Sequence, residues 1–127
     1  MILKIREVIE YESHFSKFLE KQPPKVQNKI FKIIEIIETI DRIPSTYIKL
    51  IKGTNGLYEA RIKLGTDIWR VFCFFDEGRL VILLNGFVKK TQKTPSLELN
   101  RAINLKQKYF TEKNSNYENK KLERNKR

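Results

Sequence analysis

The sequence predicts an α+β fold, in which an N-terminal helical hairpin packs on one face of a small, mainly antiparallel sheet and a C-terminal helix follows. Two stretches before residue 40 place apolar residues at helical spacing. Three stretches between residues 57 and 87 are rich in β-branched and aromatic residues, and a further helical pattern follows Thr94-Pro95. Helices followed by consecutive strands favour an antiparallel meander.

The N-terminal third predicts a short strand and two helices. Residues 2–9 alternate apolar and charged side chains, which is typical of a strand. A helix is expected over about 11–21, and Pro23-Pro24 ends it and begins the next, because proline is tolerated in a first helical turn. The second helix has the clearest apolar stripe: Val26, Ile30, Ile33, Ile34 and Ile37.

The middle of the chain predicts three strands, over 57–64, 67–75 and 79–87. Gly65-Thr66 and a turn on Asp76-Glu77-Gly78 separate them, and both are plausible hairpin connections. A last helix is expected to end near residue 112. The Asn- and Lys-rich residues 113–127 are predicted to be a disordered basic tail, which leaves residues 1–112 as a single domain.

The charge balance indicates an anionic partner. Lys and Arg number 26 against 15 Asp and Glu, a net charge of +11. Residues 113–127 hold six basic and two acidic side chains, so +7 belongs to the rest of the chain. Such an excess favours nucleic acid, by attraction and by release of counterions. Lysines that only keep the protein in solution are the alternative interpretation.

Several classes of protein are excluded by composition. The single Cys73 rules out an internal disulfide, and no Cys/His cluster has metal-ligand spacing. Charges interrupt the N-terminus too early for a signal peptide, and no apolar stretch approaches the roughly 18 residues of a membrane span. We therefore expect a cytoplasmic protein without a membrane partner.

The predicted first hairpin brings two arginines together. With Gly65-Thr66 as a two-residue turn, Arg61 lies directly opposite Arg70, on the face away from the helical hairpin. Like charges in this arrangement destabilise a strand pair unless an anion lies between them, and guanidinium groups suit phosphate. Alternatively, Glu59, a diagonal neighbour of Arg70, neutralises the pair as an ordinary ion network.

The second hairpin leaves more open. A two- or four-residue loop places Asn85 opposite Arg70, whereas a three-residue loop breaks this register. Phe72 and Phe74 fall on the arginine face, where they either stack on bases or pack under the C-terminal helix; we favour packing. The only histidine, His14, lies in the first helix, away from this face, which argues against a histidine base.

Three segments of the chain carry a family resemblance: GLYEAR at 56–61, WRVFCFF at 69–75 and LLNGFVKKTQKTP at 83–95. Together they resemble the RelE/HigB-type toxins of type II toxin–antitoxin systems, and most of all the phage-derived HigB-like branch of the RelE/ParE superfamily. The resemblance covers about residues 50–110. It implies a RelE-like fold and a ribosome-dependent mRNA endonuclease (an mRNA interferase) that inhibits translation.

The resemblance also implies a chemistry and a partner. The RNA's own 2′-hydroxyl attacks the neighbouring phosphate without a metal or cofactor, and a cognate antitoxin, in this branch usually a helix-turn-helix DNA-binding protein, silences the toxin. Such a reaction needs positive groups preorganised around the phosphate. The implied catalytic residues are Arg61, Arg70, Asn85, Lys89 and Lys90.

The implied roles differ among these residues. Arg61 and Arg70 match the sheet arginines of the family and would grip the scissile phosphate. Lys89 or Lys90 would contact phosphate, or transfer a proton if cationic neighbours depress its pKa. Asn85 stands where many relatives have histidine, so it can form hydrogen bonds but cannot be a general base. The remaining RNA contacts that we expect are Lys63, Phe72 and Lys93.

Two other functions stay open at this point. ParE-like toxins share the scaffold, lack this catalytic set and inhibit DNA gyrase. A non-cleaving module that binds RNA or the ribosome would need the same phosphate grip. The tyrosine that some RelE members use near the C-terminus has no match here, because Tyr109 falls within the last predicted helix.

Overall fold

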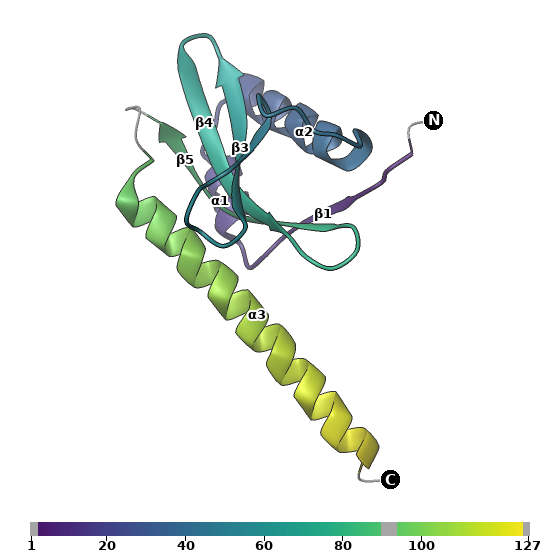
Figure 1. Cartoon of the computed structure of the whole chain (residues 1–127). Coiled ribbons are helices and arrows are strands. Elements are labelled where there is room, and N and C mark those ends of the chain that lie inside the picture. Colours follow the sequence, from purple (N-terminus) through teal and green to yellow (C-terminus); the bar gives the residue numbers. More distant parts are fainter. Residues whose placement is uncertain (1–2, 90–93, 126–127) are drawn as a thin grey trace.

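A computed structural model describes residues 3–89 and 94–125. Its elements follow the order β1 (Glu7–Glu10), α1 (His14–Glu20), α2 (Pro24–Thr39), β2 (Ile48–Leu50), β3 (Leu57–Leu64), β4 (Asp67–Phe75), β5 (Leu80–Lys89) and α3 (Ser96–Asn125). They build one five-stranded sheet with strand order β1-β5-β4-β3-β2 (Figure 1). Only β1 runs parallel to its neighbour, β5, and the other pairs are antiparallel. The predicted α+β fold is confirmed.

Helices α1 and α2 cover one face of the sheet, as the sequence predicts. The buried side of α2 carries Val26, Ile30, Ile33 and Ile37. These side chains pack in one core with Ala60, Ile62, Trp69, Val71, Cys73, Val81 and Leu83 of the sheet. Because alternate strand residues point to the same side, this single stripe of apolar residues fixes which face the helical hairpin covers.

Helix α3 covers part of the opposite face, where packing of Phe72 and Phe74 under the C-terminal helix was favoured. Ala102 and Leu105 pack on the buried side chains of Leu57, Phe72 and Phe74. The helix that was expected to end near residue 112 continues to Asn125, and its C-terminal part extends beyond the sheet (Figure 1). No helix in the described ranges combines the length and apolarity that crossing a membrane requires.

The register of the first hairpin is confirmed and that of the second is wrong. Arg61 pairs with Arg70, and Leu64 pairs with Asp67. On the other side of β4, Arg70 pairs with Phe87 rather than with Asn85. Next to the turn, β4 and β5 pair as a loop of odd length requires, which is one residue away from the predicted register. A bulge then adds one further residue to β5 between the pairs Cys73–Leu83 and Val71–Gly86. The two shifts together displace the partner of Arg70 by two residues.

Gly86 lies directly under the ring of Phe18 from α1. A Cβ atom added at this position would come within 2.4–2.7 Å of that ring. We expect Gly86→Ala to destabilise the fold by about 1–3 kcal/mol, because the closely packed helix must move away from the strand. Urea unfolding followed by Trp69 fluorescence measures this change. Replacing Phe18 by Leu in the same chain should recover part of the loss, and an unchanged unfolding midpoint for Gly86→Ala would contradict the packing.

Candidate functional site

Cationic side chains gather on the α3 side of the sheet, in three neighbouring cross-strand rows. Lys49 pairs with Glu59 in the first row, Arg61 with Arg70 in the second, and Lys63 and Lys89 flank Ile68 in the third. Paired residues point to the same side of a sheet, so all of these side chains share one face. We call this set the basic face: Lys49, Glu59, Arg61, Lys63, Arg70 and Lys89.

Arg70 is the most buried member of the basic face. Its side chain is only 2% exposed, and Nη1 donates a hydrogen bond to Oε1 of Glu59, whose side chain is 7% exposed. Thr94 donates to the other oxygen of Glu59 at 3.2 Å. The ion network that sequence analysis kept as an alternative is therefore present. Glu59 neutralises Arg70, and Nε of Arg70 is buried without a protein partner among the described residues.

Arg61 and Lys89 are the more accessible cations beside this pair. Both are half-buried, and Arg61 forms no ion pair within the described part of the chain. Partial burial, and then the positive charges of Arg70, Arg61 and Lys49, lower the pKa of Lys89 below the usual lysine value. A lysine of this kind gives up its proton more readily than a solvated one, which suits it to proton transfer as well as to phosphate binding.

Two expected site residues lie elsewhere. Asn85 does not face Arg70; its Nδ2 donates to the backbone oxygen of Glu98 at 3.1 Å and to Oε2 of Glu98 at 3.0 Å. Phe72 cannot stack on a base, because it is fully buried against Phe87 under α3, with ring centroids 5.3 Å apart. The packing interpretation of Phe72 is the correct one, and its assignment as an RNA contact is wrong.

The remaining expected contacts divide between exposed and undescribed residues. Lys63 lies near the end of β3 and is exposed. Lys90 and Lys93 lie outside the described residues. Sequence analysis missed Lys49, since β2 has only three residues and gives no alternation long enough to recognise. Within residues 3–89 and 94–125, no cluster of His, Cys, Asp and Glu side chains could hold a metal ion.

Comparison with known proteins gives one family and one fold. Residues 17–107 match the family described as "Phage derived protein Gp49-like (DUF891)". A chain of the archaeal RelE–RelB complex from Pyrococcus horikoshii OT3 superposes with a TM-score of 0.52 and 18% identity, over 68% of this chain and 97% of that one. At this identity the likeness shows a shared fold. Curated protein sequences give no match.

Proposed function

Because this chain belongs to the phage-derived Gp49-like family and has a RelE-like fold, we propose that it is the toxin of a toxin–antitoxin pair that cleaves mRNA on the ribosome. One observation supports this choice most directly: Arg61, Lys89 and Lys49 lie together on one sheet face and leave positive charge there that no described carboxylate neutralises. By its description the structural relative is a chain of a RelE–RelB complex, which supports a protein partner for this chain, and in this proposal that partner is an antitoxin that silences it. Ribosomal mRNA as substrate implies action in the cytoplasm.

The basic face meets the main demand of phosphodiester cleavage by an internal nucleophile. The 2′-hydroxyl gives up its proton to water and its oxygen forms a bond to phosphorus, the bond to the 5′-oxygen breaks, and a 2′,3′-cyclic phosphate remains on one fragment. The crowded intermediate carries additional negative charge, and fixed cations in a partly dehydrated site stabilise it most. We assign this role to Arg61, with Lys49 and Lys63 binding neighbouring phosphates.

Proton transfer falls to Lys89 in this proposal. The leaving 5′-oxygen needs a proton, and an ammonium group whose pKa is lowered donates it more readily than an ordinary lysine. Arg70 acts indirectly, because its ion pair with Glu59 holds the two middle strands in the geometry that places Arg61. Asn85, bonded to Glu98, has no part in this step.

Brief induction of the chain in bacteria, followed by primer extension on several transcripts, tests the function. We expect cuts inside reading frames, which disappear when translation is blocked. Cuts that persist when translation is blocked would support nuclease activity and contradict its dependence on the ribosome. Growth arrest with intact mRNA would contradict cleavage; replication stress would then indicate a gyrase inhibitor, and translation arrest alone a non-cleaving ribosome binder.

The pH profile of cleavage tests the role of Lys89. Only the protonated amine can donate, so the single-turnover rate on preformed ribosome–mRNA complexes should fall as pH rises through the pKa of Lys89. This fall should lie below the pH at which a lysine of pKa 10.5 titrates. Lys89→Arg keeps the charge but does not release its proton, so the alkaline fall should vanish and the rate should drop by about a hundredfold. An unchanged profile in this variant would remove Lys89 from the proton transfer.

A further inference from the structure

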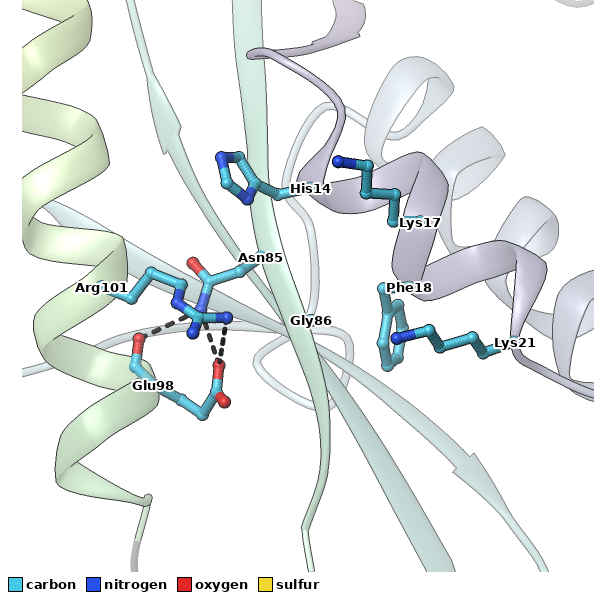
Figure 2. A pocket seen from close by; sticks show the side chains of 8 residues that line it. All are labelled: His14, Lys17, Phe18, Lys21, Asn85, Gly86, Glu98 and Arg101. Carbon is cyan, nitrogen blue, oxygen red and sulfur yellow. Dashed lines mark hydrogen bonds and ion pairs between the residues drawn. The ribbon is translucent and has the colours of Figure 1, made fainter.

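A second cationic site lies at the edge of the sheet, between α1, β5 and the first turns of α3 (Figure 2). It is a pocket of about 290 Å³, and the residues that matter to its chemistry are His14, Lys17, Lys21, Asn85, Glu98 and Arg101. Asn85 is four residues before Lys89 on the same strand, which is about 13 Å along the strand. The pocket therefore lies close enough to the basic face for one RNA strand to contact both.

The pocket exists because β5 loses a neighbour partway along its length. β1 pairs only with Leu80–Leu83 of β5, and the chain then turns into α1. From Leu84 onward this edge of β5 has no strand partner among the described residues. Helix α1 forms one wall and α3 the other, with the strand edge between them (Figure 2). Gly86, which has no side chain, lets the ring of Phe18 lie directly on the strand, and both residues line the pocket.

The charges around the pocket are predominantly positive. Lys17 lies on α1 and Lys21 directly follows its last residue; both are exposed and have no carboxylate partner within the described part of the chain. Arg101 reaches Glu98 only at 3.9 Å, with half of its side chain exposed. Nε2 of His14 shares a hydrogen bond with Oε1 of Glu12 at 2.9 Å, and Glu12 is not among the residues that line the pocket. Three cations facing one carboxylate favour an anionic ligand.

Asn85 adds a requirement of a different kind. Its side chain is buried, and its Nδ2 donates to the backbone oxygen and to Oε2 of Glu98. Because only the NH₂ group can donate, these two bonds fix the orientation of the amide. Oδ1 consequently points away from Glu98 (Figure 2), and it is buried with no described donor. A buried carbonyl oxygen without a partner is uncommon, and a ligand N–H or O–H would satisfy it.

We propose that this pocket binds one nucleotide of an RNA strand, with its phosphate held by Lys17, Lys21 and Arg101 and a base or ribose group donating to Oδ1 of Asn85. RNA combines the anion and the donor in one unit, and the imidazole of His14, one third exposed, offers a face for stacking. The inference depends on the proposed function only in the choice of RNA as ligand. An acidic protein segment would also supply an anion and a backbone N–H donor, but it has no base to stack on His14.

Nuclear magnetic resonance with the full, isotope-labelled chain tests the proposal. A single-stranded RNA trinucleotide should move the resonances of the Asn85 side-chain amide and of His14, the only histidine in the sequence. The double variant Lys17→Gln/Lys21→Gln should weaken this binding by about tenfold or more, as expected for lost phosphate contacts. The matched control, Lys25→Gln/Lys32→Gln on α2, removes the same charge from exposed positions and should leave the affinity nearly unchanged.

Three outcomes would overturn the proposal: no shift at Asn85 and His14, equal binding of inorganic phosphate, or tighter binding of polyglutamate than of RNA. An equal loss in the control variant would likewise indicate unspecific attraction. Arg61→Ala separates this inference from the nuclease proposal, because it alters the basic face and should leave the shifts of His14 intact. If the chain makes no cuts in cells but binds the trinucleotide in this pocket, the pocket proposal stands and the nuclease proposal fails.

Discussion

Arg61→Ala should abolish measurable mRNA cleavage while leaving the fold intact. Arg61 is half-buried, pairs across the hairpin with Arg70 and forms no ion pair in the described part of the chain, so no buried carboxylate loses its partner when Arg61 is removed. Loss of one preorganised donor to a transition-state oxyanion typically costs about 10²–10³-fold in rate. Removing Arg61 also relieves its repulsion with Arg70, which favours the folded state slightly.

The measurement compares cut fractions of one transcript after equal induction of each variant, with soluble protein levels checked alongside. Arg79→Ala is the matched control, since Arg79 is an exposed arginine in the turn between β4 and β5, distant from the basic face in the sheet register. Arg61→Lys should restore part of the rate, because it returns the charge without the planar fork. Full cleavage by a folded Arg61→Ala variant would remove Arg61 from the site.

Local patterns were sufficient to predict most elements. The bounds of β3 and β4 match the prediction, and the two-residue turn set their register, because Gly65 adopts a φ of +64°, which a type II′ hairpin turn needs at its first central position. The apolar stripe of α2 likewise identified the covered face. These features depend on residues close in sequence, which is why one sequence was enough.

The position of α3 depends on information that alternation does not carry. Packing of Phe72 and Phe74 under the C-terminal helix was favoured over base stacking, and both side chains are fully buried. The signal was present in β4: Val71–Phe75 is apolar without interruption, as in strands covered on both sides. Alternation alone predicts one buried and one exposed face, so the continuation of α3 beyond residue 112 and the contact of its Glu98 with Asn85 were missed.

The candidate site was predicted in part for a related reason. Arg61 and Lys89 share a face because the two register shifts of β5 together restore its parity. Asn85 falls at the bulge itself, where alternation stops being informative, and its partner Glu98 comes from α3. Lys17 and Lys21 were visible at helical spacing, on α1 and directly after it, but only the fold brings them beside Arg101.

Breaking the ion pair between Glu59 and Arg70 should have the largest effect on stability. Both side chains are more than 90% buried, so Glu59→Ala leaves a guanidinium group in the interior, and Arg70→Ala leaves a carboxylate there. Removing one partner of a buried pair costs about 3–5 kcal/mol, because the remaining charge has lost its counterion. The hydrogen bond from Thr94 to Glu59 compensates only in the Arg70 variant.

The double variant Glu59→Leu/Arg70→Met separates charge burial from packing. It removes both charges and keeps similar volume, so it should be more stable than either single variant. Urea unfolding followed by the fluorescence of Trp69, the only tryptophan, measures the stability of all three variants. Additive losses in the double variant would contradict a paired, buried interaction. Since Arg70→Ala combines a folding defect with any catalytic one, its loss of toxicity cannot by itself assign Arg70 to the phosphate, whereas a folded double variant that still cleaves would show that Arg70 serves the fold.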